Sequence, residues 1–409
     1  MKKKLKFFIV DDNKDFINLA SKLLEAENHI IFSSDSSVNA LSEIIEQKPD
    51  CALLDIMMPD IDGFELCRRL RREPSLDEMK IIIVSGKSYE FDRSSAFEFG
   101  ADGYITKPID SKMFSKQILR LIKDRIHITF WGVRGTLPAP GEENIRYGGN
   151  TSCVSLEFAD GNLMIFDAGT GIKSISDHLM AEKRLPIEAK IFISHPHWDH
   201  INSIPFFAPL YTRGNEFEIC GPSYGEYTIR ELISAQMDGV FFPIKIKDFS
   251  ATVNFNNLRE ETFNMNSMEI RIMLLNHPGN CLGYRVQYRG RSVSYVTDNE
   301  IYPKSSRFYN EEYMNKLMDF VKDTDALITD CTYNDEDYKS KINWGHSSIG
   351  QVVDLSDRAG VKTLYLFHHE PSQTDSDIDA KLETAQVMLK HRKSRTSCIA
   401  PKEKQLFKI

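Results

Sequence analysis

His195-Pro196-His197-Trp198-Asp199-His200 places four metal-binding side chains within six residues. The stretch directly follows residues 189–194, Ala-Lys-Ile-Phe-Ile-Ser, an apolar, β-branched run that predicts a buried strand. Because the chain turns where a strand ends, the two histidines beside Pro196 can face one metal ion while Asp199 and His200 turn towards a second. Imidazole and carboxylate groups bind zinc and other first-row metals, and no thiolate is interleaved here. The stretch therefore predicts a metal centre rather than a solvated polar loop.

Further candidate ligands also follow apolar runs that predict strands. His277 comes after Leu274-Leu275, Asp298 ends the run 292–297, and His368 ends the run 363–367. Such positions lie where open sheets present their ligands. His369 is the alternative to His368 for the last position.

Taken together, these residues resemble the metallo-β-lactamase fold superfamily, whose motifs follow in this order over residues 130–370. The first motif is Asp167-Ala168-Gly169-Thr170-Gly171, after a predicted strand at 163–166. The resemblance implies an αββα sandwich with two divalent metal ions, and it favours His368 over His369. The ligands that it implies are His195, His197 and His277 on one ion, Asp199, His200 and His368 on the other, and Asp298 between them. Zinc is the expected metal, while manganese or iron stays open because the affinity order does not decide occupancy in cells.

Length and composition predict more than one domain. At roughly 150 residues per domain, 409 residues indicate two or three. The formal charge of −8 disfavours strong nucleic-acid binding, which relies on basic surface. The seven cysteines are scattered with no C-x-x-C pair, as in reduced cytosolic proteins. The apolar run 7–10 is too short for a signal-peptide core and no run approaches a membrane span, so we expect a cytoplasmic protein with no membrane partner.

The distribution of histidines marks a domain boundary. Only His29 precedes residue 125, and the other ten follow it. Residues 1–124 alternate short apolar runs with amphipathic segments, which predicts a doubly wound, flavodoxin-like parallel sheet. The clear strands are expected at 7–10, 51–54, 81–84 and 103–106. Residues 125–409 would form the second, metal-binding domain.

Polar residues follow these predicted strands where such sheets bind ligands. They are Asp11, Asp12, Asp55, Ser85 and Lys107. The set resembles the receiver domain of two-component response regulators, over residues 1 to about 124. The resemblance implies a Mg²⁺ ion held by Asp11, Asp12, Asp55 and the carbonyl of Met57, because crowded carboxylates repel one another without a hard cation.

The same resemblance implies that Asp55 accepts a phosphoryl group from a cognate histidine kinase. Lys107 would pair with the phosphoryl charge, Ser85 would donate its hydroxyl, and Tyr104 occupies the switch position. Lys107-Pro108 resembles the family's cis peptide. Homodimerisation through the face containing Tyr104 is possible by family analogy. The alternative is a degenerate receiver that serves only as a docking platform.

The join between the two predicted domains is abrupt. A helix is expected to end at 119–124 and a strand to begin at 126–130, with no Gly/Ser-rich or Pro-rich spacer. A short connection favours mechanical coupling over loose tethering. Regulation of the second domain through domain packing is therefore a hypothesis.

Motifs of the second domain favour phosphodiester chemistry. Residues 130–136 and 146–152 resemble the opening of a phosphodiesterase-like branch related to ribonuclease Z, and 327–333 and 345–348 resemble its paired later motifs. The resemblance implies that Asp330 supports His346 near the leaving group. A carboxylate stabilises a charged imidazole, which could then protonate the departing oxygen. The alternative role for His346 is a structural hydrogen bond.

The expected mechanism is two-metal hydrolysis, with Asp199 and Asp298 orienting the nucleophile and His346 assisting the leaving group. The chain lacks a long flexible insertion rich in Gly, Lys and Arg that would grip tRNA. A small or cyclic nucleotide, or a similar phosphodiester, is the better substrate. The alternatives are a non-hydrolytic diiron-type sensor and a signalling scaffold. The sensor branch typically carries Glu where this chain has His197.

Overall fold

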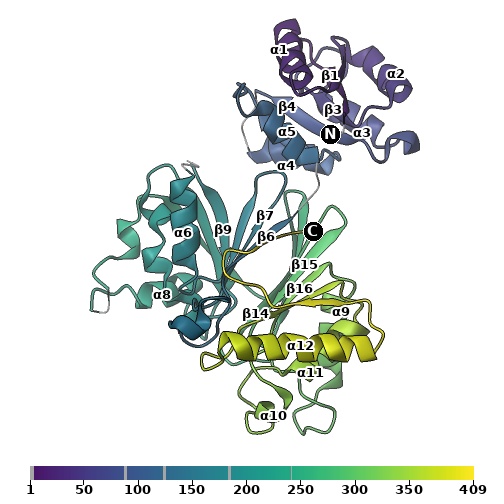
Figure 1. Ribbon diagram of the computed structural model, residues 1–409. Coiled ribbons are helices and arrows are strands. Elements are labelled where there is room, and N and C mark those ends of the chain that lie inside the picture. Colours follow the sequence, from purple (N-terminus) through teal and green to yellow (C-terminus); the bar gives the residue numbers. More distant parts are fainter. Residues whose placement is uncertain (1–3, 87–89, 123–125, 183–185, 241) are drawn as a thin grey trace. The chain divides into compact units, whose positions relative to one another are not determined.

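The computed structural model describes residues 4–86, 90–122, 126–182, 186–240 and 242–409. The chain forms two compact units that meet in sequence near Ile126 (Figure 1). The predicted boundary between residues 124 and 125 lies outside the described residues. Among the described helices, none is long and apolar enough to cross a membrane.

The first unit is built on one parallel sheet with strand order β2-β1-β3-β4-β5. Its strands are β1 (Lys6–Val10), β2 (Ile30–Ser34), β3 (Cys51–Leu54), β4 (Lys80–Ser85) and β5 (Gly103–Thr106). Its helices are α1 (Lys14–Glu25), α2 (Ser37–Gln47), α3 (Gly63–Leu70), the short η1 (Pro74–Leu76), α4 (Glu90–Glu98) and α5 (Phe114–Ile122). The four predicted strands are confirmed. The edge strand β2, which is only partly buried, was not among them.

Alternating residues of β1 feed two separate cores. Phe7 and Ile9 pack in one hydrophobic cluster, whereas Phe8 and Val10 pack in another. Both faces of the sheet are therefore buried, as a parallel sheet requires. Polar side chains are left for the carboxyl ends of the strands, where Asp11, Asp55 and Ser85 lie.

The second unit contains two seven-stranded sheets. The first has the order β11-β10-β9-β8-β7-β6-β19 and the second has the order β12-β13-β14-β15-β16-β17-β18. The strands of the first sheet are β6 (His127–Gly132), β7 (Cys153–Glu157), β8 (Leu163–Phe166), β9 (Glu188–Phe192), β10 (Glu216–Pro222), β11 (Thr252–Leu258) and β19 (Leu406–Lys408). Those of the second are β12 (Thr262–Met265), β13 (Met268–Leu274), β14 (Leu282–Tyr288), β15 (Arg291–Val296), β16 (Ala326–Asp330), β17 (Thr363–Phe367) and β18 (Ser397–Ile399).

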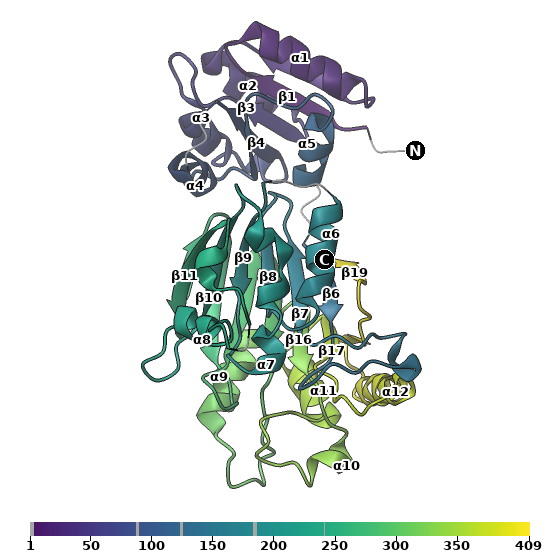
Figure 2. The ribbon, with the colours of Figure 1, turned by 90° about the vertical axis from the view of Figure 1, so that its left-hand side faces the viewer.

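Helices cover the outer faces of both sheets (Figures 1 and 2). Against the first sheet lie α6 (Ile172–Ala181) and α8 (Ile229–Ala235), and against the second lie α9 (Glu311–Val321), α11 (Ile349–Arg358) and α12 (Asp375–His391). The shorter elements are α7 (Trp198–Ile201), α10 (Asp335–Tyr338), η2 (Glu142–Asn144), η3 (Ile204–Phe206), η4 (Ala208–Tyr211) and η5 (Ile246–Asp248). The predicted αββα sandwich is confirmed.

An aromatic layer joins the two sheets. Phe166 of β8 lies 5.2 Å from Tyr295 of β15 and 5.8 Å from Tyr284 of β14 between ring centroids. The two tyrosines also donate hydrogen bonds across the sandwich, to the Asp167 carboxylate at 2.7 Å and to the Ile193 carbonyl at 2.6 Å. The strand ends of the two sheets are therefore held in fixed register.

Three residues at these strand ends adopt the left-handed backbone conformation without being glycine. They are Asp167 (φ 59°), Asp298 (φ 30°) and His368 (φ 56°). This conformation costs of order 1–3 kcal/mol at a residue that is not glycine, and such strain gathers at functional sites. All three are among the polar residues that the sequence singles out.

Candidate metal centre

Four side chains converge at the carboxyl ends of the strands. His195 and His197 follow β9, His277 follows β13 and Asp298 follows β15, and their ligand atoms all lie within 4.8 Å of one another. The His197 Nδ1 atom lies 2.9 Å from His195 Nε2 and 3.2 Å from His277 Nε2. Two nitrogens on one tetrahedral zinc ion are about 3.3 Å apart. The spacing therefore fits ligands around a single ion.

A second group shares Asp298 with the first. Asp199, His200 and His368 form a second compact set of ligand atoms. The Asp298 Oδ1 atom lies 3.3 Å from His200 Nε2 and 3.1 Å from His368 Nε2, while its Oδ2 atom lies 3.6 Å from His195 Nε2. One oxygen thus faces each group, as a carboxylate between two ions would.

His200 provides a direct test of whether a cation fits. Its ring is fully buried, and among the described residues its Nε2 atom has no hydrogen-bond partner. This nitrogen points at the oxygens of Asp199 and Asp298, at 3.1 and 3.3 Å. A cation among these atoms would satisfy all of them, so the donor set fits a divalent metal.

Asp167 holds the second group from behind. Its carboxylate accepts hydrogen bonds from the Ser194 backbone N–H at 2.7 Å and from the Ser194 hydroxyl at 2.9 Å. It also lies 2.7 Å from His200 Nδ1, which fixes the orientation of that ring. On the other side of the centre, His277 Nδ1 lies 2.9 Å from the Gly345 carbonyl. Such contacts orient metal ligands and raise their basicity.

Burial and charge set the protonation of the centre. Burial lowers the pKa of His195 well below its usual value and also lowers the pKa values of His197 and His277. These imidazoles are therefore neutral, which is the form that binds metal. Burial opposes the charged form of His200 as well, but the surrounding carboxylates outweigh it and raise the pKa of His200 well above the usual value.

His346 and Asp330 form the predicted contact. His346 Nδ1 lies 2.8 Å from Asp330 Oδ2, and Asp330 is fully buried at the end of β16. Although burial opposes it, the charge and hydrogen bond of Asp330 raise the pKa of His346 to about 9. The His346 ring lies 5.1 Å from that of His277 and 5.0 Å from that of His368, so the pair stands beside both ligand groups.

In the first unit, Lys107 bridges two buried carboxylates. Its ammonium lies 2.6 Å from Asp11 Oδ2 and 2.7 Å from Asp55 Oδ1. The other oxygen of Asp55 accepts the Met57 backbone N–H at 2.6 Å. Burial raises the pKa of Asp11, against the opposing effect of Lys107. The three groups meet as the sequence predicted, and Lys107-Pro108 is cis.

The remaining predicted residues of this site lie around that triad. Asp12 is exposed, Ser85 is buried, and the Tyr104 side chain is mostly buried with a hydrogen bond to Ser85. Among the described residues, the carboxylates of Asp11, Asp12 and Asp55 do not form a compact metal-binding group. A Mg²⁺ ion would require the Asp12 side chain to turn towards the other two.

Comparison with known proteins assigns both units. Residues 163–369, half of the chain, match the beta-lactamase superfamily domain, and residues 7–119 match the response regulator receiver domain. The chain belongs to the beta-lactamase superfamily. It carries a receiver domain fused to a metallo-β-lactamase-fold domain.

Individual proteins are similar to one or the other part of the chain. The alkaline phosphatase synthesis transcriptional regulatory protein PhoP of Bacillus subtilis is 26% identical over 190 residues, which are 46% of this chain and 68% of PhoP. The metallo-beta-lactamase fold protein YhfI from Bacillus subtilis has a TM-score of 0.50 and 16% identity, and the match covers 70% of this chain and all of YhfI. A diphosphatase from the PhnP family has a TM-score of 0.49 and 15% identity, over 69% of this chain and 98% of that protein.

Two buried charged residues support the metallo-β-lactamase-fold site without having been predicted. Glu300 accepts hydrogen bonds from the backbone N–H groups of Asn343 and Gly345, at 2.7 and 2.8 Å, and so fixes the loop before His346. Lys381 donates to the carbonyls of Cys331 and Thr332 and to Gln373 Oε1. Thr332 in turn donates to Asp330 at 2.7 Å and lies 3.1 Å from His368 Nδ1.

A sequence signal for Lys381 exists. The buried face of α12 consists of Ile378, Lys381, Ala385 and Leu389, so a lysine stands in an otherwise apolar stripe at helical spacing. Glu300 gives a weaker signal, as a carboxylate two residues after Asp298.

His369 takes no part in either ligand group. It is fully buried, its ring lies 6.4 Å from that of Tyr147, and neither ring nitrogen has a hydrogen-bond partner in the described part of the chain. Burial, with help from the nearby cations Lys381 and Arg134, lowers the pKa of His369 well below its usual value. The structure thus brings His368, and not His369, to the centre.

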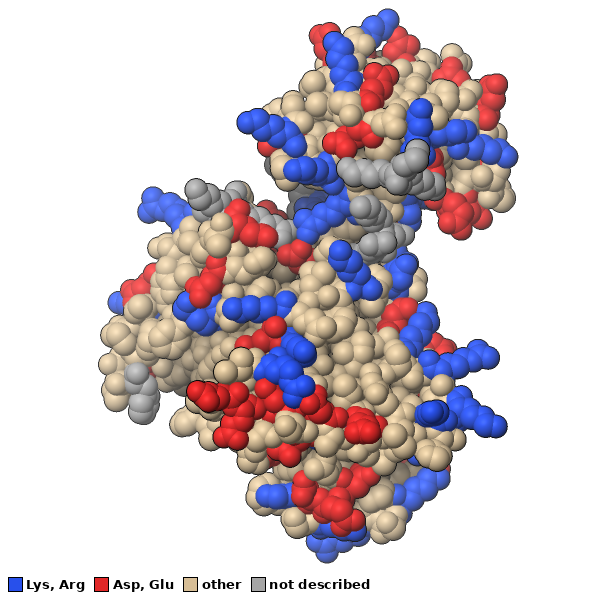
Figure 3. Space-filling model, in the orientation of Figure 1, with Lys and Arg blue, Asp and Glu red and all other residues tan. Residues whose placement is uncertain are grey.

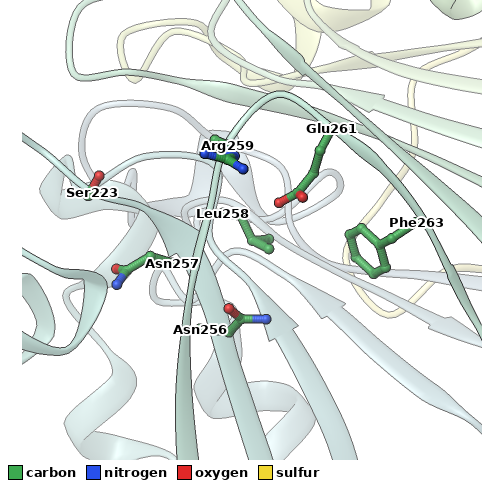
Figure 4. Close-up of a pocket in the computed structure, with 7 residues that line it drawn as sticks. All are labelled: Ser223, Asn256, Asn257, Leu258, Arg259, Glu261 and Phe263. Carbon is green, nitrogen blue, oxygen red and sulfur yellow. The ribbon is translucent and has the colours of Figure 1, made fainter.

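A cavity of about 490 Å³ is lined by the segment after β10, by the end of β11 and by β12 with the residues that precede it. Figure 4 shows Glu261 and Phe263 extending towards the segment that carries Leu258 and Arg259. Its remaining lining residues are Ser223, Asn256 and Asn257. Ser223 follows β10 and its carbonyl accepts a hydrogen bond from the Asn280 side chain at 3.1 Å, so the cavity adjoins the loop that carries His277.

Proposed function

We propose that this chain is a two-component response regulator whose output domain is a di-metal hydrolase of a small phosphodiester. A small or cyclic nucleotide is the expected kind of substrate, and phosphorylation of Asp55 by a histidine kinase is the expected control. The proposal places the ions on the residues His195, His197, Asp199, His200, His277, Asp298 and His368.

One observation carries the proposal. The Asp298 carboxylate presents one oxygen to each ligand group, and His346, held by Asp330, stands beside both groups. A structural zinc site is closed by its protein ligands, whereas a catalytic site keeps an open side. Here the open side is marked by His197, which is exposed, and by His277 and His346, which are partly exposed.

Two divalent cations would supply nucleophilic water at neutral pH and neutralise phosphate charge. The chain's own groups supply orientation and a proton. Asp199 is held by the Thr136 backbone N–H at 2.7 Å, with Asp298 next to it. Asp330 engages His346 at Nδ1, which leaves Nε2 to protonate the departing oxygen. Asp199, Asp298, Asp330 and His346 thus supply the orientation and the proton that this hydrolysis needs.

The surface supports a small substrate over a long polyanion. Figure 3 shows acidic and basic side chains interspersed on one face of the molecule, with acidic side chains gathered where α12 lies. The net charge is −8. A nucleic acid would need a continuous basic surface to displace its counterions.

The test compares two diesters in protein loaded with Zn²⁺ or Mn²⁺. Bis(p-nitrophenyl) phosphate has a leaving group that needs no proton, whereas a dinucleotide or cyclic nucleotide has one that does. We expect turnover of bis(p-nitrophenyl) phosphate that Asp199→Ala abolishes. His346→Gln should cost about 100-fold or more on the nucleotide diester but under about tenfold on the nitrophenyl ester.

Equal losses on both diesters would remove His346 as the proton donor and leave it a structural role. Absence of turnover in protein that contains both ions would contradict the hydrolase itself, and would favour the sensor or the scaffold.

A further inference from the structure

The three tryptophans of the chain have contrasting environments. Trp131 is 6% exposed, and its indole N–H donates to the Ser155 hydroxyl at 2.8 Å. Trp198 is 79% exposed and Trp344 is 58% exposed. Large aromatic side chains are normally mostly buried, so two exposed indoles require a reason. Trp198 begins α7 between two candidate metal ligands, and Trp344 lies in the loop before His346.

Hydrogen bonds of neighbouring residues hold the backbone at each exposed indole. Trp198 lies between His197 and Asp199, and its carbonyl accepts the Asn202 backbone N–H at 2.8 Å in the turn of α7. Trp344 lies between Asn343 and Gly345, whose backbone N–H groups both donate to the buried Glu300. The backbone at both indoles is therefore held in place, and a side chain with only two rotatable bonds loses little entropy when its ring binds a ligand.

A short path of contacts links the two positions across the open side. His197 Nδ1 lies 3.2 Å from His277 Nε2, and His277 Nδ1 lies 2.9 Å from the Gly345 carbonyl. Trp198 neighbours the first residue of this path in sequence, and Trp344 neighbours the last. Trp198 and Trp344 are therefore the sequence neighbours of the two ends of this row, one after β9 of the first sheet and the other after β16 of the second.

The charge beside Trp344 suits an anionic ligand. The Lys341 ammonium lies 3.9 Å from the centroid of the Trp344 ring. Among the described residues, no ring or cation packs against Trp198. A ring that stacks on Trp198 would lie next to ligands of the ions that take the phosphate.

We propose that Trp198 and Trp344 bind the planar ring of the substrate, so that the enzyme acts on phosphodiesters of nucleosides in preference to those of simple alcohols or sugars. This inference rests on the proposed function and names its substrate class. Stacking tolerates every base because each has a π-face, so discrimination among bases is small.

The binding test uses the intrinsic tryptophan fluorescence of the metal-loaded protein. AMP and GMP should quench it and bind about tenfold more tightly than ribose 5-phosphate or inorganic phosphate. Trp198→Ala should weaken AMP binding about tenfold, measured by calorimetry, and leave phosphate binding unchanged. Trp198→Phe, which keeps a ring, should restore most of the affinity. Val387→Ala removes another exposed apolar side chain, on α12, and should change nothing.

The kinetic test compares two esters with the same leaving group, methyl p-nitrophenyl phosphate and the p-nitrophenyl ester of thymidine monophosphate. The wild-type preference in kcat/KM for the nucleoside ester should be about tenfold larger than the preference of Trp198→Ala. The difference should arise from a higher KM of the variant for the nucleoside ester.

An unchanged preference in an active enzyme would overturn the inference and leave the proposed function standing. Ring-selective binding without any turnover would support ring binding by the indoles and contradict the proposed hydrolase. Equal binding of AMP and ribose 5-phosphate, together with loss of a protein complex in Trp198→Ala, would assign the indoles to a protein interface instead.

Discussion

Asp298 combines strain and charge at a single residue. Its backbone is left-handed, its side chain is 2% exposed, and its two oxygens face histidines on both sides. Burial opposes ionisation, but His368 and His200 hold the pKa of its carboxyl well below the usual range. A residue in this state is over-determined by its surroundings, which is the condition under which strain persists at a functional site.

The residue that orients a ligand should matter almost as much as the ligand. Asp167→Asn removes the charge that His200, Ser194 and Tyr295 all contact. Loss of such a partner typically costs 10- to 100-fold in metal affinity, so we expect Zn²⁺ affinity to fall by about that factor. Competition with a chromophoric chelator measures it. Asp177→Asn, an exposed carboxylate on α6, is the matched control, and equal affinities in the two variants would contradict the role of Asp167.

Two adjacent histidines offer a sharp comparison. His368→Ala should reduce the metal content from about two ions per chain to about one, because His368 belongs to the second ligand group. His369→Leu should leave the content unchanged, because neither of its ring nitrogens has a hydrogen-bond partner among the residues that the structure describes. Elemental analysis of dialysed protein decides between them. Loss of an ion from His369→Leu alone would assign the ligand to the other residue.

At the scale of elements, the sequence predicts the strand ends better than the support behind them. Apolar runs followed by His or Asp indicate β9, β15 and β17 and the side chains that come next, because that pattern is local. Glu300 and Lys381 were missed because their roles depend on contacts with residues far away in the chain, such as Gly345 and Cys331. The edge strand β2 was missed because an edge strand lacks the continuous apolar run of a central one.

The same non-local support predicts a stability effect in α12. Lys381→Met would leave the Cys331 carbonyl without its buried donor, whereas the Thr332 carbonyl keeps a bond from Gln373; the loss should lower the free energy of unfolding by about 1–3 kcal/mol. Lys390→Met changes an exposed lysine on the same helix and should cost under about 0.5 kcal/mol. Urea titration followed by circular dichroism measures both. A result within 0.5 kcal/mol of wild type for Lys381→Met would show that the buried ammonium is not needed there.

At the scale of the whole molecule, a receiver domain and a metallo-β-lactamase-fold domain share one chain. In the receiver, Lys107 contacts both Asp11 and Asp55, so a phosphoryl group on Asp55 would compete for the Lys107 ammonium. The hypothesis that this change is passed to the second domain stays a prediction, as do the cytoplasmic location and the homodimer.

Beryllofluoride, which mimics a phosphoryl group on Asp55, provides the test of coupling. We expect it to change hydrolysis of bis(p-nitrophenyl) phosphate by at least about fivefold, the low end of a typical coupling free energy of about 1–3 kcal/mol. Asp55→Asn should abolish the response without changing the metal content of the second domain. An identical response in Asp55→Asn, or none in the wild type, would make the receiver a docking platform.

The most direct test of the central claim is to measure metal content and phosphodiester turnover on the same preparation. Protein reconstituted with Zn²⁺ or Mn²⁺ should bind about two ions in the second domain and hydrolyse bis(p-nitrophenyl) phosphate, and His195→Ala should lose an ion and the activity together. Two bound ions with no turnover of this or any nucleotide diester would contradict the assignment of this centre as a phosphodiesterase.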